Sequence, residues 1–213
     1  MKRTNLKHIP APLFRRRFTL SRRQSAEVTV CGLGFYELYI NGEKITKGRL
    51  APYISNPDDV VYYDKYDLTD YIRSGENVIG VCLGNGLLNN PGGKTWDFDK
   101  AAFRSVPKLA IHFSSDEVRF EADEKFKVFP SPITFDDYRC GEFYDARREI
   151  DGWSLPGFND SDWKAPLKAE APKGIRRYCT AEPIREFDRI APVSIEKTDE
   201  GFLYDFGIND SGV

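Results

Sequence analysis

The sequence predicts an all-β protein: an antiparallel jelly-roll β-sandwich followed by the first strands of a second β-sandwich. Three observations support this prediction. Apolar and polar residues alternate in several short runs, turn residues separate these runs, and no segment has a long helical period. Alternation buries one face of a strand, so repeated runs favour packed sheets. A chain of 213 residues can form one large β-domain and part of another.

The first 26 residues contain eight Lys or Arg and no acidic residue. We assign residues 1–25 to a basic leader and a first strand. Two interpretations of Arg15–Arg17, Arg22 and Arg23 remain open: they bind an anionic partner, or they are solvated side chains of an edge strand, where charge discourages pairing between sheets. We favour the second interpretation. The net charge of −2 gives no overall field for nucleic acid or a membrane, and neither is an expected partner.

Residues 26–178 are assigned to the main sandwich. Its strongest local signal is a hairpin in which Tyr36–Ile40 and Glu43–Thr46 flank Asn41 and Gly42, because Asn and Gly both tolerate the positive φ of a type I′ turn. Further strands are predicted at Ala26–Cys31, Val78–Leu83, Leu109–Phe113, Val118–Ala122 and Lys125–Phe129. A short helix is predicted over Leu68–Arg73, capped by Asp67 or Thr69.

A long polar loop covers residues 85–100, where Asn, Pro and Gly are frequent. Sugar-binding sites combine an aromatic ring, which stacks on the apolar face of a pyranose, with polar groups that bond its hydroxyls. Five residues of this loop have that composition and are the candidate carbohydrate-binding residues: Trp96, Asp97, Asp99, Asn89 and Asn90. The competing interpretation, which we favour for Trp96, is that its ring pins the loop onto the sandwich.

Glu142 and Asp145 are the obvious carboxylate pair for glycoside hydrolysis, which needs two carboxyl groups and a raised pKa on one of them. Arg147 and Arg148 would instead lower a neighbouring carboxyl pKa. We therefore interpret Asp145 and Arg147 as a structural ion pair and predict no catalytic residue.

The acidic pairs Asp136–Asp137 and Asp97/Asp99 have the oxygen chemistry of a calcium site, but no Asp-x-Asp-x-Asp-Gly loop is present. We favour solvated loop acids and expect no metal or other cofactor. His112 is expected on the solvent side of a strand, and Trp153 and Trp163 are expected to be core anchors. The four cysteines are widely spaced and predict neither a disulfide framework nor a zinc site.

Residues 179–213 are assigned to the start of an incomplete second β-sandwich, with strands at Val193–Glu196 and Phe202–Gly207 around a turn at Thr198–Gly201. The alternative is that these strands pair with the preceding domain. The sequence has no secretory apolar run near residue 1 and no apolar run long enough to span a membrane, so we expect a cytoplasmic protein.

Several motifs occur in a specific order. They are Tyr36–Gly42, Leu50–Pro52, Tyr66–Ile72, Gly75–Asn77, Gly84–Gly86, Gly141–Arg147, Gly152–Trp153, Phe158–Trp163, Glu182–Arg185 and Asp205–Gly212. Together they resemble the N-terminal, galactose-binding-like domain of bacterial α-L-rhamnosidases of glycoside hydrolase family 78. This chain differs at two places: Leu87–Leu88 replaces the usual Trp-Tyr pair, and Ile208 replaces the usual Gln.

The resemblance implies that the parent protein is a multidomain glycosidase that removes terminal α-L-rhamnose with inversion, using carboxylates of an (α/α)₆ barrel. No counterpart of that barrel is present in this sequence. The resemblance therefore implies a non-catalytic N-terminal portion whose partners are the catalytic barrel, the second sandwich and, through the parent enzyme, a rhamnoside. The alternative is a stand-alone carbohydrate-binding module.

Overall fold

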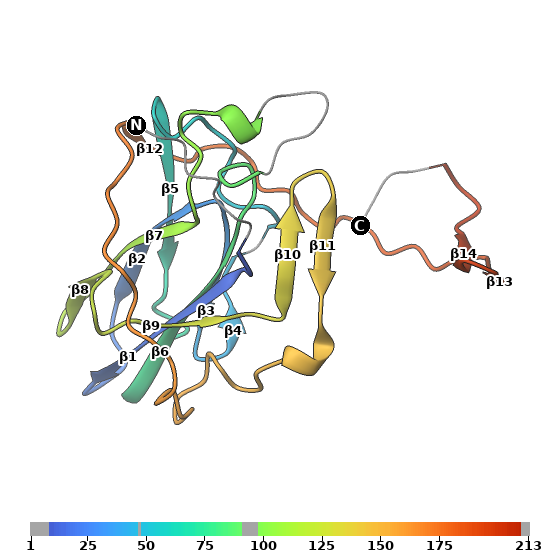
Figure 1. Cartoon of the computed structure of the whole chain (residues 1–213). Coiled ribbons are helices and arrows are strands. Elements are labelled where there is room, and N and C mark those ends of the chain that lie inside the picture. Colours follow the sequence, from blue (N-terminus) through green and yellow to red (C-terminus); the bar gives the residue numbers. More distant parts are fainter. Residues whose placement is uncertain (1–8, 47, 91–97, 210–213) are drawn as a thin grey trace. The chain divides into compact units, whose positions relative to one another are not determined.

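The computed structural model describes residues 9–46, 48–90 and 98–209. The chain divides into two compact units, Met1–Pro183 and Ile184–Val213 (Figure 1). The predicted boundary between residues 178 and 179 stays a prediction. We describe each unit separately.

The first unit is a β-sandwich. Within the described residues, two five-stranded sheets have the orders β4-β3-β6-β1-β9 and β12-β5-β2-β7-β8 (Figure 1). The first sheet contains β4 (Glu43–Lys44), β3 (Phe35–Ile40), β6 (Gly75–Gly84), β1 (Pro12–Leu20) and β9 (Lys127–Pro130). The second contains β12 (Ile175–Tyr178), β5 (Val60–Asp67), β2 (Ala26–Leu33), β7 (Lys108–Ser115) and β8 (Arg119–Glu121). The predicted jelly-roll sandwich is confirmed.

Strand alternation places the core between these sheets. In β3, Tyr36, Leu38 and Ile40 are buried while the intervening residues are partly exposed. The same period in the other strands adds Val28 and Val30 of β2, and the cluster includes Phe18, Ile79, Val81, Leu83, Ile111, Phe113, Phe120 and Phe126. Full burial of one large apolar side chain contributes roughly 1.5–3 kcal/mol, so this cluster is the main source of stability.

The predicted β3–β4 hairpin is confirmed, with φ of 50° at Asn41 and 88° at Gly42. Asn41 also ties this turn to the next strand. Its Nδ2 donates to the Tyr71 carbonyl and to Asn77 Oδ1 at 3.0 and 2.8 Å, and its Oδ1 accepts from the Val78 amide at 2.9 Å. The turn residue is therefore also a brace between β3 and β6.

The predicted helix over Leu68–Arg73 is wrong. The segment forms a single turn, in which the amides of Tyr71 and Ile72 donate to the Leu68 carbonyl at 2.9 and 3.2 Å. Asp67 caps it as expected, accepting from the Thr69 amide at 2.9 Å. Asn77 ends it, because its side chain bonds both the amide and the carbonyl of Arg73 and directs the chain into β6.

The solvated edge strand expected for the arginines is also wrong. Strand β1 pairs with β6 on one side and β9 on the other. Arg15 is 0% exposed and Arg16 is buried, whereas Arg17, Arg22 and Arg23 are exposed. The Arg16 guanidinium lies 3.9 Å from the centroid of the Phe120 ring and 2.5 Å from an Asp123 carboxylate oxygen. Residues distant in the sequence thus make the burial of these cations tolerable.

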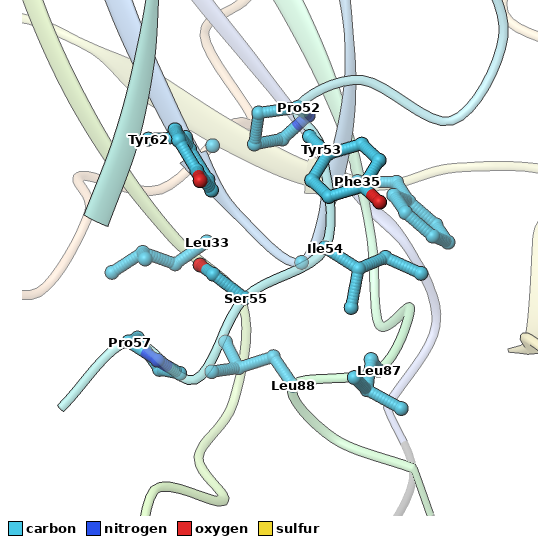
Figure 2. Close-up of a pocket in the computed structure, with 12 residues that line it drawn as sticks. Leu33, Phe35, Pro52, Tyr53, Ile54, Ser55, Pro57, Tyr62, Leu87 and Leu88 are labelled. Carbon is cyan, nitrogen blue, oxygen red and sulfur yellow. The ribbon is translucent and has the colours of Figure 1, made fainter. Parts of the chain in front are cut away.

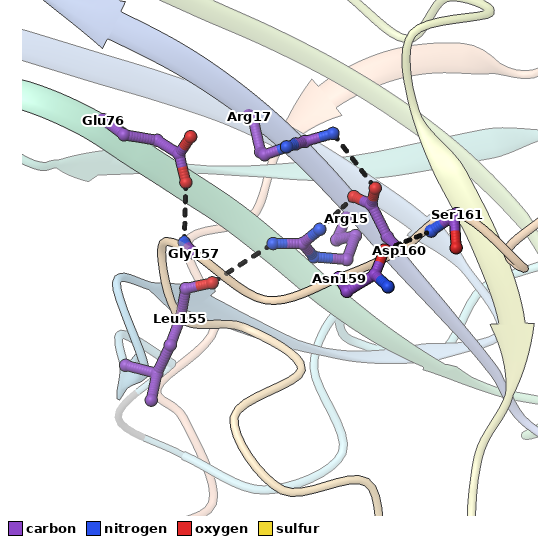
Figure 3. A network of polar contacts seen from close by, with 8 residues as sticks. All are labelled: Arg15, Arg17, Glu76, Leu155, Gly157, Asn159, Asp160 and Ser161. Carbon is purple, nitrogen blue, oxygen red and sulfur yellow. Dashed lines mark hydrogen bonds and ion pairs between the residues drawn. The ribbon is translucent and has the colours of Figure 1, made fainter.

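Residues 150–163 form a cover over the outer face of the first sheet, and we call them the cover segment. Asp160 accepts from Arg15 and Arg17, Arg15 donates to the Leu155 carbonyl at 3.1 Å, and the Gly157 amide donates to Glu76 at 2.8 Å (Figure 3). This polar network attaches the cover segment to β1 and β6.

Aromatic packing also holds the cover segment. A Cβ atom added at Gly80 would lie 2.8 Å from Trp153 Cζ3, so the indole packs directly on the β6 backbone. Trp163 is buried and stacks on Phe129 with ring centroids 5.4 Å apart. The prediction of two anchors is confirmed for Trp163. Trp153 is an anchor too, but it is half-buried, and neither indole belongs to the main core cluster between the sheets.

Smaller elements complete the first unit: β10 (Ile133–Asp137) pairs with β11 (Gly141–Tyr144), and two 3₁₀ turns, η1 and η2, cover Phe98–Lys100 and Ala146–Arg148. His112 faces solvent as predicted, with its side chain 51% exposed. All four cysteines, each in the described part of the chain, are free thiols.

The second unit contains an antiparallel hairpin of β13 (Ser194–Thr198) and β14 (Gly201–Asp205). Both predicted strands are confirmed. All ten residues of the two strands are exposed. Their assignment to a second β-sandwich stays a prediction.

Candidate functional site

The predicted carbohydrate-binding residues are only partly described. Trp96 and Asp97 lie outside the described residues, and so does the side chain of Asp99, whose backbone belongs to η1. Asn89 and Asn90 are 0% and 1% exposed, and therefore face the interior rather than solvent. The loop site as a whole stays a prediction.

The turn that precedes this loop is held by Asp136 of β10. One carboxylate oxygen accepts from the amides of Asn85 and Gly86 at 2.6 and 3.2 Å, and the other accepts from Asn85 Nδ2 at 2.7 Å. Asn89 Nδ2 in turn donates to Asn85 Oδ1 at 2.7 Å. These bonds position the turn between β6 and the loop.

The interpretation of Asp136 and Asp137 as solvated loop acids is wrong, because both lie in β10 and accept backbone hydrogen bonds. Asp137 is buried, and its Oδ1 accepts from the amides of Arg139 and Cys140, each at 2.8 Å. Among the described residues, no group of three or more His, Cys, Asp or Glu side chains could hold a metal ion.

An apolar cavity lies at the end of the sandwich beside this turn, and Figure 2 shows its walls. They include Phe35, Tyr53, Ile54, Tyr62, Leu87 and Leu88. Its volume is about 40 Å³, enough for only a few water molecules, because one water needs roughly 10–15 Å³ of such space. Leu87 and Leu88 therefore help to close this end of the sandwich, and the cavity is too small for a sugar.

A larger pocket lies on the outer face of the first sheet, between that face and residues 131–155, and we call it the outer-face pocket. Its volume is about 440 Å³, within the range of about 300–1,000 Å³ that is usual for small-molecule sites. The side chains that give it polar and aromatic character are Glu37, Tyr39, Tyr144, Glu149, Asp151 and Trp153.

Two tyrosine–carboxylate pairs line the outer-face pocket. The Tyr39 hydroxyl donates to Glu37 at 2.7 Å, and the Tyr144 hydroxyl donates to Glu149 at 2.8 Å. Burial, together with the bond to Glu37, raises the pKa of Tyr39 above its ordinary value, so its hydroxyl stays protonated. The Tyr39 ring meets Trp153 edge to face at 5.3 Å, which fixes both rings.

Sequence reasoning missed this pocket because β3 and residues 131–155, which supply most of its lining, are more than ninety positions apart in the chain. Two signals were available. Glu37 and Tyr39 lie on the face of β3 opposite Leu38, and Trp153 follows a turn glycine. Neither signal indicates that the two segments meet.

Asp145, one of the two carboxylates considered for catalysis, has a structural role. Asp145 caps η2 and accepts from Arg147 Nε and Nη2 at 2.8 and 2.9 Å. These hydrogen bonds lower the pKa of Asp145, which is the wrong direction for a general acid. The predicted structural ion pair is confirmed.

Residues 21–188 match the family model described as "Alpha-L-rhamnosidase N-terminal domain". The chain belongs to this family. The order of the motifs from Tyr36 to Gly212 had indicated the same relationship. As an N-terminal domain of the α-L-rhamnosidase type, the chain has the all-β architecture that the motifs implied.

Solved and curated relatives agree with this assignment. An α-L-rhamnosidase of Formosa agariphila is 33% identical over 215 residues, which cover 95% of this chain and 22% of the relative. The structure of an α-L-rhamnosidase from Dictyoglumus thermophilum is 38% identical with a TM-score of 0.81, covering 93% of this chain and 22% of that one. The Streptomyces avermitilis α-L-rhamnosidase, solved with L-rhamnose, is 26% identical with a TM-score of 0.83, covering 94% and 20%.

This chain thus spans about a fifth of the length of the relatives that it matches. In the described part of the chain, no helix has the length and apolar character needed to cross a membrane.

Proposed function

We propose that this chain is the non-catalytic N-terminal β-sandwich portion of a larger α-L-rhamnosidase-like glycoside hydrolase, and that the larger protein removes terminal α-L-rhamnose from glycosides. The observation that carries the proposal is the family match over residues 21–188, in a chain that covers only about a fifth of its relatives. The role of Asp145 agrees with it, because the ion pair with Arg147 opposes general-acid catalysis.

In this proposal the domain acts by packing. Its partners are a catalytic barrel and a second sandwich, and it meets a rhamnoside only through the parent enzyme. The core between the two sheets and the attached cover segment make it a rigid support. A cytoplasmic location and the lack of a cofactor remain predictions.

The test compares the 213-residue chain with the gene product purified from its source cells. We expect the gene product to be several times heavier by intact mass and to release L-rhamnose from an aryl α-L-rhamnoside. The 213-residue chain should give no turnover. Turnover by the short chain, or a gene product that ends near Val213, would contradict the proposal.

The second candidate function is a stand-alone carbohydrate-binding module. The outer-face pocket favours it, because its volume of about 440 Å³ and its aromatic and carboxylate lining suit a small polar ligand. Saturable binding of a sugar by the 213-residue chain would support this function. A stand-alone module also requires a gene product that ends near Val213, whereas in a longer product the same binding would belong to one domain of the larger protein.

A further inference from the structure

We propose that the outer-face pocket is a binding site for a neutral saccharide, formed where Tyr39 and Glu37 of β3 face Tyr144, Glu149, Asp151 and Trp153. The site lies on the outer face of the first sheet, whereas the predicted loop of residues 85–100 follows the end of β6. The proposal does not depend on whether the larger protein hydrolyses rhamnosides.

Size is the first argument. The pocket is about ten times larger than the end cavity, at about 440 against 40 Å³. It is an open pocket between a rigid sheet and residues 131–155, which the Trp153 contact with Gly80 and the hydrogen bond from the Gly157 amide to Glu76 hold in place. A site held by such contacts is already formed before a ligand arrives, which lowers the entropic cost of binding.

The aromatic residues supply the apolar contacts. Tyr39 and Trp153 are half-buried and fix each other edge to face, and Tyr144 is 52% exposed. Such rings pack against the C–H face of a pyranose while their polar atoms reach its hydroxyls. Leu13, Ile133 and Leu155 add further apolar surface to the walls.

The polar residues determine the class of ligand. Glu37, Glu149 and Asp151 line the pocket, and among its described lining residues none is Lys, Arg or His. Three carboxylates accept hydrogen bonds from hydroxyl groups and repel anions, although Lys44 and Arg49 lie beside one of them, Glu37. Lys44 pairs with Glu37, the Tyr39 hydroxyl donates to Glu37, and the Tyr144 hydroxyl donates to Glu149. These contacts already stabilise two of the carboxylates, so the pocket does not need a cationic ligand to balance them. A neutral polyhydroxylated ligand fits these groups best.

The experiment titrates the 213-residue chain with methyl glycosides of L-rhamnose, D-galactose and D-glucose, with galacturonate, and with galactosamine, using ligand-observed NMR and calorimetry. We expect saturable binding of at least one neutral sugar and at least tenfold weaker binding of galacturonate. Tyr144→Ala and Asp151→Ala should each weaken the neutral sugar at least tenfold. Both side chains are exposed, so these variants should fold.

Matched controls separate the pocket from other surfaces. Tyr178→Ala and Asp162→Ala remove an exposed tyrosine and an exposed aspartate that do not line the pocket, and they should leave affinity unchanged. Trp96→Ala tests the predicted loop site and should also leave the affinity unchanged. The unfolding midpoint of each variant confirms folding.

Three results would overturn the proposal. One is the absence of saturable binding across the panel. Another is loss of binding in Trp96→Ala with full binding in Tyr144→Ala and Asp151→Ala, which places the site on the loop. The last is tighter binding of galactosamine than of every neutral sugar, which makes the pocket a cation site. Each result is measured on the isolated chain and is therefore independent of rhamnosidase turnover by the gene product.

Discussion

Arg15 is a fully buried cation, and its charge is balanced by Asp160 of the cover segment (Figure 3). Burial lowers the pKa of Arg15, and the neighbouring Asp160 charge opposes that shift. A buried charge that loses its partner is far more costly than an exposed pair that is broken. Arg15 of β1 can therefore be buried only when the cover segment holds Asp160 beside it.

We predict that Asp160→Ala lowers the free energy of unfolding by about 3–5 kcal/mol, because it leaves Arg15 buried without a counter-charge. Arg17→Ala is the matched control. The Arg17 side chain is half exposed and bonds the same carboxylate, so its loss should cost at most about 1 kcal/mol. Urea unfolding measures both. Equal losses of unfolding free energy in the two variants would show that the buried Arg15–Asp160 pair contributes no more to stability than the exposed Arg17 contact.

A second residue-scale prediction concerns alkaline pH. Burial raises the pKa of Tyr66 to about 12, above the ordinary value of about 10. An unfolded tyrosine then ionises before the folded one, so this contribution to stability is complete below pH ~10 and is lost as pH rises toward ~12. The thermal midpoint should fall over that window. The fall of the thermal midpoint should be shallower in Tyr66→Phe. It should be unchanged in Tyr53→Phe, the control, because Tyr53 is 62% exposed.

At the scale of elements, β6 is the central strand of the first sheet and is packed on both faces. Ile79, Val81 and Leu83 face the main core, while Gly80 carries the Trp153 ring on the opposite face. The missing side chain at Gly80 thus sets the depth at which the cover segment lies on the sheet.

We predict that Gly80→Ala destabilises the protein by about 1–3 kcal/mol, since the added methyl would overlap Trp153. The Gly80→Ala/Trp153→Leu double variant tests the cause: most of the penalty of Gly80→Ala should disappear when the indole is absent. A full penalty in both backgrounds would show that the indole is not responsible and would leave the β6 backbone and Ser154 Cβ, 3.1 Å from the added methyl, as the causes.

The sequence predicted the strands whose alternation is regular. The core positions of β2, β3, β6 and β7 follow from period-two runs, and the Asn41–Gly42 turn follows from its φ requirements. Strand β1 was misplaced because three consecutive arginines conceal its apolar face. Their partners, Asp160 and the Phe120 ring, are more than a hundred residues away. Local patterns do not contain such pairings, and the outer-face pocket was missed for the same reason.

At the scale of the whole molecule, the two units differ in how they are stabilised. The first has the core between two sheets, whereas every residue of β13 and β14 is exposed. An isolated two-stranded hairpin is marginally stable in water. Most of the stability of this chain therefore belongs to Met1–Pro183.

We predict that a chain ending at Pro183 unfolds at the same urea concentration as the full chain. Hydrogen exchange gives an independent measurement. Amides of β13 and β14 should exchange rapidly, while those of β6 should exchange only through global unfolding. A lower urea midpoint for the shorter chain would show that the second unit stabilises the first, and slow exchange in β13 and β14 would show that the first stabilises the second.

The Arg15–Asp160 pair joins residues 145 positions apart, and this separation has a consequence for synthesis on the ribosome. At roughly 5–20 residues per second, Asp160 is made between about 7 and 30 s after Arg15. During that interval β1 has no counter-charge for the guanidinium that it must bury. The nascent chain can collapse around β2, β3 and β6, but β1 has to keep Arg15 hydrated. The strands of the first sheet are all made by Pro130, but its outer face is covered only after residues 150–163 have left the exit tunnel.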